Sequence, residues 1–196
     1  MVNHSRSGAC AAGLPAAAGW PGAAGAAALV LAAYALAASP ATLWDRDEPR
    51  FARATVEMVG SGNYLYPTFN GRLRADKPVL VYWLMSLPVR LLGPTELACR
   101  VFGAVGSAAT CLLTYWIGRR LMGGPAGLWA MAALGSSLLM LVMGTAATAD
   151  AVMLPCVVAG VAVLAHRLSG PPRWWHGPAL AAACAAAMLA KGPMGL

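Results

Sequence analysis

Long apolar segments alternate along the chain with one charge-dense segment at residues 45–100. A membrane-spanning helix needs roughly 20 mostly apolar residues, and four or five segments reach or approach that length. They lie at 20–40, at 101–117, in two stretches between about 125 and 165, and at 178–190, the last being short for a span. The pattern predicts an all-α membrane protein with about five transmembrane helices.

The apolar pattern divides the chain into four parts. They are an N-terminal tail at 1–19, a first transmembrane helix at 20–40, an outer loop at 41–100 with interfacial helices, and transmembrane helices two to five at 101–196. The small residues Ala37-Ala38-Ser39 resemble a signal-peptide cleavage site. We expect an uncleaved anchor instead, because the apolar stretch is long and further spans follow it.

The charged segment contains a predicted helix at 48–60. Pro49 and acidic residues stand at its start, and both favour a helix N-terminus. Arg50, Arg53 and Glu57 recur at helical spacing and share one face, while apolar residues occupy another. A helix of this kind is expected to lie on the membrane surface.

A second short helix is predicted after a turn. Asn70-Gly71 is typical of a turn, and Lys77-Pro78 then leads into the apolar segment 79–87, which is too short to span a membrane. We predict an interfacial helix over this segment, broken near Pro88.

Arginines in short loops indicate the orientation of the chain in the membrane, because they favour the cytoplasmic side. Two such loops carry Arg119-Arg120 and Arg167 with Arg173. Counting spans from these loops places the 41–100 loop, Asp150 and Lys191 together on the outer face. Asp150 is the one acidic residue within a long apolar run, where an ionisable side chain indicates a functional role.

Composition excludes a soluble domain, because 59% of the residues are hydrophobic and 11% charged, against about 25% charged in an ordinary soluble domain. The net charge of +7 does not indicate nucleic-acid binding, since no basic cluster is interleaved with aromatic residues. Membrane lipid headgroups explain the excess of basic residues better. The five cysteines lack C-x-x-C spacing, and all three histidines fall on the predicted inner face, so we assign no metal ligands.

Taken together, the polar motifs and their order resemble a family of bacterial membrane enzymes. The motifs are Asp47-Glu48, Glu57-Met58, Gly62, Pro67, Gly71, Lys77-Pro78, Tyr82-Trp83, Arg100, Thr148-Ala149-Asp150 and Lys191-Gly192-Pro193. This order resembles the dolichyl-phosphate-mannose/protein mannosyltransferase-like glycosyltransferases, and among them the type that transfers aminoarabinose to lipid A. The resemblance extends over about residues 20–196.

The resemblance implies a GT-C fold and a function. The enzyme would take a sugar from a polyprenyl-phosphate donor and move it to a lipid, glycan or protein acceptor. It would be a multi-pass protein of the cytoplasmic (inner) membrane with a periplasmic or extracellular active face. Because this chain has only about five spans, it looks like the N-terminal portion of such an enzyme.

The resemblance also implies roles for residues of this chain. Asp47 and Asp150 fall on the catalytic positions, and Lys77 on the position expected to hold the donor phosphate. The remaining predicted substrate-binding residues are Arg50, Glu48, Glu57, Tyr82 and Lys191. Asp76 stands where the lipid A enzymes have a glutamate associated with zinc, so no metal ligand is assigned and a divalent metal is left open.

Simpler interpretations of these residues stay open. Asp47 could be a helix N-cap, Lys77 and Arg50 could bind lipid headgroups, and Glu57 could pair with Arg53 along the helix. In that case the chain would be a small non-catalytic membrane protein, either a truncated remnant or a lipid-binding accessory subunit. A transporter is a third alternative, which the position of the acids near one interface disfavours.

Overall fold

The computed structural model describes residues 20–38, 43 and 47–195, and the structural statements below concern these residues. Helices dominate this part of the chain, and one short hairpin interrupts them. The elements are α1 (Trp20–Ala38), α2 (Glu48–Ser61), β1 (Thr68–Phe69), β2 (Arg72–Leu73), α3 (Leu80–Leu92), α4 (Glu96–Met122), α5 (Gly124–Gly135), α6 (Leu138–Thr145), α7 (Ala149–Leu168), α8 (His176–Lys191) and a 3-10 turn, η1 (Gly192–Gly195). The predicted all-α membrane fold is confirmed.

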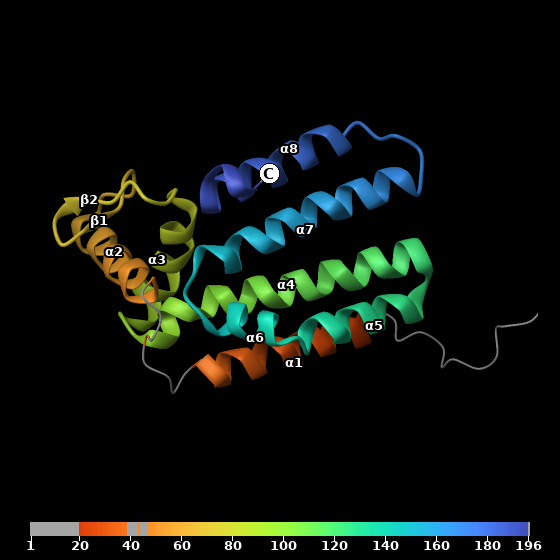
Figure 1. Ribbon diagram of the computed structural model, residues 1–196, viewed down its shortest axis with the longest axis horizontal. Helices are drawn as coiled ribbons and strands as arrows, with labels where there is room; N and C mark the ends of the chain where they lie inside the picture. The colour runs from red at the N-terminus through yellow and green to blue at the C-terminus, as the bar shows by residue number, and fades with distance from the viewer. Residues whose placement is uncertain (1–19, 39–42, 44–46, 196) are drawn as a thin grey trace, which may run out of the picture.

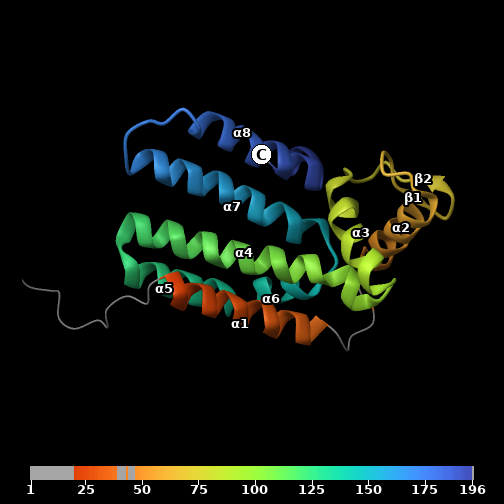
Figure 2. The same ribbon diagram turned by 180° about the vertical axis from the view of Figure 1, so that it is seen from behind.

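The described residues form a helical bundle with a smaller cap at one end. Figures 1 and 2 show α1, α4, α5, α7 and α8 running side by side, with α4 in the middle. The cap consists of α2, the β1–β2 hairpin and α3 (Figure 1). The first residues of α4 and α7 and the last residues of α8 reach the same end of the bundle. The polar segments of the chain therefore meet at this end, although they are far apart in the sequence.

By length and composition, three described helices could cross a membrane, and a bent pair of helices makes a fourth span if it is counted as one. The three are Pro21–Ala38 within α1, α4 and α7, while α5 and α6 would together form one span bent by 65°. The expected fifth span corresponds to α8, whose 16 residues are fewer than a typical span requires. The described chain therefore has three or four candidate spans, against about five expected.

Two predicted helix boundaries were wrong. The second span was expected to begin after Arg100, but α4 begins at Glu96, where the Thr95 hydroxyl accepts a hydrogen bond from the Ala98 amide at 3.2 Å. The segment at 79–87 was expected to break near Pro88, but α3 continues to Leu92. Burial of apolar side chains on both sides of Pro88 offsets the backbone hydrogen bond that proline removes.

The predicted turn at Asn70-Gly71 is the turn of a β-hairpin, which the pattern did not reveal. Both residues have positive φ, 52° and 73°, as a two-residue hairpin turn of type I′ requires. The strands pair Thr68 with Leu73 and Phe69 with Arg72. Strands of two residues are too short for alternating polarity to be visible in the sequence.

Close packing of α4 against α7 fixes the start of α7. A Cβ atom on Gly106 would lie 2.3 Å from the Ala151 carbonyl oxygen, and one on Gly103 would lie 2.8 Å from the Ala146 carbonyl oxygen. Only glycine permits this approach, which is typical of membrane helices with small residues at their interface. As a result, the start of α7, which carries Asp150, is held directly against α4.

Candidate functional site

A buried ion pair joins the cap to the bundle. The Arg100 guanidinium donates two hydrogen bonds to the Glu48 carboxylate, at 3.0 and 2.8 Å, and a third to the Ala38 carbonyl oxygen at 2.9 Å. The same carboxylate accepts a hydrogen bond from the Ala147 amide at 2.6 Å. Glu48 and Arg100 are 0% and 1% exposed. Four segments, namely the end of α1 and the starts of α2, α4 and α7, are therefore fixed at one point.

The buried pair determines where Asp47 lies. Asp47 is the N-cap residue of α2, but its side chain makes no cap hydrogen bond. Its carboxylate is 3.8 Å from the Arg50 guanidinium, and both side chains are partly exposed. Asp47 is therefore held at the edge of the cap with its carboxylate accessible to a ligand.

A second polar cluster surrounds Tyr82. The Arg74 Nε atom donates a hydrogen bond to the Tyr82 hydroxyl at 3.0 Å, and its guanidinium is 3.6 Å from the Asp76 carboxylate. Burial raises the pKa of Tyr82, the nearby Asp76 and Asp47 carboxylates add to this effect, and Arg74 opposes it. Because its pKa is raised, Tyr82 stays protonated at neutral pH.

Arg74 is a further candidate site residue, which the sequence did not reveal. Its side chain is buried, with the guanidinium 5.5 Å from the Phe51 ring centre and 5.9 Å from that of Phe69. Cation–π contacts of this kind compensate a buried arginine in part. Phe51 lies on α2 and Arg74 follows the hairpin. No helix or strand periodicity relates the two positions, so the contact is seen only in the fold.

Asp150 and Lys191, which the sequence placed on one face, form an ion pair that joins the start of α7 to the end of α8. Both side chains are partly exposed, so the pair is accessible to solvent or ligand. Next to it, the Thr148 hydroxyl is buried without a hydrogen-bond partner in the described part of the chain, although Thr148 is the N-cap residue of α7. Unsatisfied buried hydroxyls are uncommon in native structures.

Lys77 lies just before α3 and is partly buried. Within the described residues it forms no hydrogen bond or ion pair. Arg50 and Lys191, the other two predicted site cations, each have a carboxylate partner, whereas the Lys77 ammonium group has none among the described residues. An anion can therefore approach it without displacing an existing contact.

Glu57 holds the hairpin turn. Its carboxylate accepts hydrogen bonds from the Thr68 hydroxyl at 2.9 Å and from the Asn70 and Gly71 amides at 2.8 and 3.3 Å. Arg53 also donates to it at 2.9 Å, so the expected pairing along α2 is present. Burial acts to raise the pKa of Glu57, but these four hydrogen bonds outweigh it and lower the pKa.

The lowered pKa of Glu57 predicts an acid-sensitive hairpin. The carboxylate stabilises the turn above its unfolded-state pKa of about 4.5, and this contribution is lost as pH falls through the lower folded-state pKa. We expect hydrogen-exchange protection of the Asn70 and Gly71 amides to fall in that window. In Glu57→Gln, protection should be lower at neutral pH and insensitive to acid. Protection of the parent amides that stays unchanged down to the lowest pH at which the protein remains folded would contradict this role.

The described residues contain no group of three or more His, Cys, Asp and Glu side chains that could hold a metal ion. Asp76, at the position that the resemblance connects with zinc, is exposed and faces Arg74 instead. The described residues therefore provide no ligand set for a metal ion, and no step of the proposed chemistry uses one.

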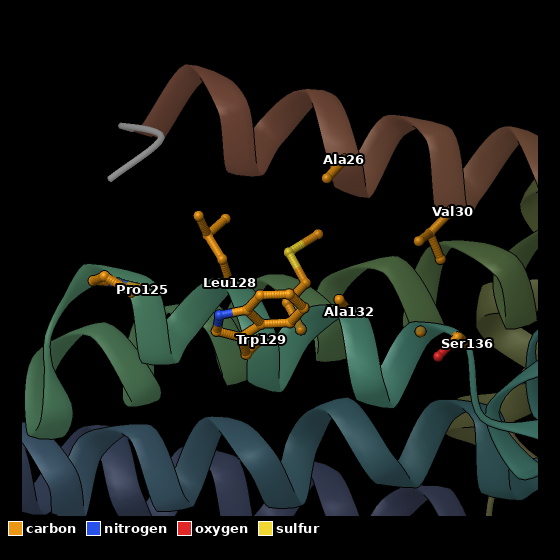
Figure 3. A pocket seen from close by; sticks show the side chains of 9 residues that line it. Ala26, Val30, Pro125, Leu128, Trp129, Ala132 and Ser136 are labelled. Atoms are coloured by element: carbon orange, nitrogen blue, oxygen red, sulfur yellow. The ribbon is translucent and has the colours of Figure 1, made fainter. Parts of the chain in front are cut away.

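Two apolar grooves lie along the bundle, away from the predicted site residues. The first encloses about 560 Å³ between α1 and α5, and its lining, shown in Figure 3, includes Val30, Leu128 and Trp129. The second encloses about 410 Å³ between α4, α7 and the start of α8. None of the predicted site residues lines either of these two grooves.

Solved structures with this fold are known. The chain superimposes on ArnT from Cupriavidus metallidurans in the apo state with a TM-score of 0.80 and 23% identity, over 91% of this chain and 34% of that one. Against the same protein bound to undecaprenyl phosphate, the TM-score is 0.62 with 25% identity, over 92% and 34% of the two chains. The predicted GT-C fold is thereby confirmed for the part of that fold that this chain represents.

The chain is also similar in sequence to several curated arabinosyl transferases. The chain is 32% identical over 167 residues to the undecaprenyl phosphate-alpha-4-amino-4-deoxy-L-arabinose arabinosyl transferase 2 of Sodalis glossinidius, which covers 83% of this chain and 30% of that protein. It is 37% identical over 83 residues to the corresponding transferase of Edwardsiella ictaluri, 42% of this chain and 15% of that one. The chain thus spans about a third or less of the length of these relatives.

The family match covers most of the part of the chain that follows the hairpin. Residues 76–196 match the family described as dolichyl-phosphate-mannose-protein mannosyltransferase. The segment includes Lys77, Tyr82, Asp150 and Lys191, and it therefore contains half of the eight predicted site residues. The chain belongs to the dolichyl-phosphate-mannose-protein mannosyltransferase family of glycosyltransferases.

Proposed function

We propose that the protein of which this chain is the whole or a part transfers a sugar from a polyprenyl-phosphate donor to an acceptor at the outer face of the inner membrane. One observation carries the proposal: an accessible carboxylate and a lysine without a partner in the described residues lie at the cap, at the same end of an apolar bundle as the Asp150–Lys191 pair. The names of the relatives favour a 4-amino-4-deoxy-arabinose as the sugar and undecaprenyl phosphate as its carrier.

The proposed chemistry is a displacement at the anomeric carbon. The acceptor hydroxyl forms the new C–O bond, its proton passes to the Asp47 carboxylate, and the bond to the carrier phosphate breaks. Negative charge then grows on the leaving phosphate, where a fixed cation is most effective. If the acceptor group is itself a phosphate, it needs no base, and Asp47 would only orient it.

Lys77 is the proposed cation for the leaving phosphate. It has no partner among the described residues, in contrast to Arg50, which is near Asp47. Arg50 would assist from the edge of α2, and its contact with Asp47 keeps the two groups within reach of one ligand. Lys191 stands beside Asp150 and would orient the acceptor with it.

Glu48 and Tyr82 are proposed as positioning residues. Glu48 is fully buried against Arg100 and Ala147, so its influence on the substrate would pass through the position of Asp47. Tyr82 is fully buried too and would act through its hydrogen bond with Arg74. Glu57 would act at a greater distance, by holding the hairpin that carries Arg74 and leads to Lys77.

The proposed orientation rests on charge. The turns at the opposite end of the bundle carry Arg119, Arg120, Arg167 and Arg173, which favour the cytoplasm. The cap would then face the periplasm or the exterior. A cysteine introduced at the exposed hairpin residue Leu73 should react with an impermeant maleimide added outside intact cells.

The function is tested by measuring sugar transfer in membranes that contain the full-length protein. Given undecaprenyl-phosphate-linked aminoarabinose and lipid A, we expect sugar-dependent modification of the lipid and release of the carrier phosphate. Donor hydrolysis without transfer to lipid A would point to a glycan or protein acceptor. No consumption of this donor or of other polyprenyl-phosphate sugars would overturn the proposal.

Lys77→Met is expected to lower kcat/KM for the donor by about 10- to 100-fold, the worth of a hydrogen bond to a charged group. Lys77→Arg keeps the charge and should retain most of the activity. Steady-state kinetics with varied donor concentration separates the two variants. Equal activity of Lys77→Met and the parent would remove Lys77 from the site.

A further inference from the structure

The end of the bundle opposite the cap is purely basic in the described chain. Arg119 and Arg120 end α4, and Arg167 and Arg173 flank the turn between α7 and α8. The acidic residues that the structure describes are Asp47, Glu48, Glu57, Asp76, Glu96 and Asp150, and they lie in segments that reach the cap end. Arg120, Arg167 and Arg173 are exposed and form no ion pair within the described residues.

The second apolar groove leads to this basic end. It is lined by apolar residues of α4 and α7, and then by three rings, those of Trp116, His166 and Trp175. The Trp116 and His166 rings are stacked, 6.0 Å apart and 4° from parallel, which joins α4 to α7. The Arg120 guanidinium lies 5.5 Å from the Trp116 ring centre, so a cation stands beside the polar end of the groove.

A chain of hydrogen bonds fixes the second side of the groove. The Arg173 amide donates to His176 Nδ1 at 2.9 Å, so the proton of neutral His176 must be on Nε2. That Nε2 atom is 2.9 Å from His166 Nδ1 and therefore donates to it. The His166 ring in turn meets Trp175 edge-on, with ring centres 4.9 Å apart. Trp175 and the backbone of Arg173 are thus held in place beside the groove.

Arg120 and Arg173 come from two elements that border the groove. Arg120 is in the last turn of α4 beside Trp116, and Arg173 is in the α7–α8 turn, where its amide is bonded to His176. Gly170 in that turn lies close to Arg120, since a Cβ atom there would be 3.6 Å from an Arg120 guanidinium nitrogen. Two cations, two tryptophans and an apolar groove therefore meet at one place.

We propose that this place is a selective binding site for an anionic phospholipid. One acyl chain lies in the groove along Leu112, Leu113 and Val163, and the phosphate is held by Arg120 and Arg173, with Trp175 at the level of the glycerol. Arginine suits phosphate through its forked donors, and a tryptophan ring suits the interface between chain and headgroup. The site is at the opposite end from the proposed transferase site and does not depend on it.

The α1–α5 groove provides a contrast. It is larger, but apart from the Trp129 ring nitrogen its lining has one polar side-chain group, the Ser136 hydroxyl, and no cation (Figure 3). Such a groove would accept acyl chains without regard to the headgroup. Charge at the mouth of the α4–α7 groove is what predicts selectivity.

The test uses the full chain in nanodiscs of phosphatidylcholine that contain brominated phosphatidylglycerol or, in parallel, brominated phosphatidylcholine. The difference in tryptophan quenching between the parent and Trp175→Phe reports lipid beside Trp175. We expect phosphatidylglycerol to be preferred by at least about fivefold, since each arginine near an anionic headgroup is worth about that factor. Equal quenching by the two lipids in the parent would overturn the proposal without any arginine substitution.

A matched pair of variants separates a site from general attraction to a basic surface. Arg120→Gln and Arg119→Gln remove the same charge from adjacent residues, but the Arg119 guanidinium donates to Tyr115 at 2.9 Å and its Cβ faces Gly127 of α5. We expect Arg120→Gln, and likewise Arg173→Gln, to lower the preference about fivefold, and Arg119→Gln to leave it unchanged. Equal losses in the Arg119 and Arg120 variants would mean nonspecific attraction and would refute a defined site.

Discussion

Replacement of Asp47 by asparagine should lower the rate of sugar transfer by about 10²- to 10⁴-fold, the usual contribution of a general base. The substitution preserves the shape of the side chain and removes its ability to take a proton. Since the Asp47 side chain makes no cap hydrogen bond, α2 should lose little stability. Transfer is measured in membranes that contain the full chain, at saturating donor and acceptor, so that binding effects are separated from the chemical step.

Two comparisons define the outcome for Asp47. Glu96→Gln removes an exposed carboxylate from the first turn of α4 and should leave transfer unchanged, which controls for loss of negative charge near the cap. A loss of less than about tenfold in Asp47→Asn would assign an orienting role, as expected for a phosphate acceptor. Full activity of Asp47→Asn would exclude Asp47 from the reaction.

Removal of either partner of the Glu48–Arg100 pair should destabilise the fold by about 3–5 kcal/mol, because the remaining buried charge loses its ion-pair partner. Arg100→Met leaves the Glu48 carboxylate fully buried, and Glu48→Leu leaves the Arg100 guanidinium in the same condition. The free energy of unfolding is measured for the full chain in detergent micelles by denaturant titration. The Asp47 position should shift with the pair, so transfer activity should fall in both variants.

The double variant, Glu48→Leu with Arg100→Met, provides the decisive comparison. With no charge left unpaired, it should recover most of the lost stability, short of about 1–3 kcal/mol for the Ala147 amide and the Ala38 carbonyl that lose their partner. It should not recover activity if the pair serves to position Asp47. Additive losses in the double variant would show that the two side chains contribute independently.

The membrane fold and the gathering of polar segments could be predicted from the sequence because both depend on hydropathy. The α2 helix, the turn at Asn70-Gly71 and the proximity of Asp150 to Lys191 followed from periodicity, turn chemistry and span counting. Span counting did not predict that α8 is short or that the third span is bent between α5 and α6. The apolar pattern does not show that α8 is slightly too short for a span. It also does not show the bend between α5 and α6, because no proline marks it.

Interactions between distant polar residues could not be predicted from the sequence. Arg100 was interpreted as a boundary because a charge usually ends a span, yet it lies inside α4, where Glu48 from 52 residues away neutralises it. Glu48 itself was expected to bind substrate, and that role stays a prediction. The contact of Arg74 with Tyr82 likewise depends on how the hairpin folds back, which no local pattern specifies.

The unbroken length of α4 has a consequence for where the reaction would occur. Arg100 and Arg120 lie on one helix, 20 positions apart, and at 1.5 Å per residue this is about 30 Å, the thickness of the hydrocarbon layer of a membrane. If Arg120 is level with the headgroups of one leaflet, Arg100 is level with those of the other. Asp47, held beside the Glu48–Arg100 pair, then lies in the plane where a carrier lipid keeps its phosphate. The donor would need only to diffuse sideways within its leaflet, with its isoprenoid tail remaining in the bilayer throughout the transfer.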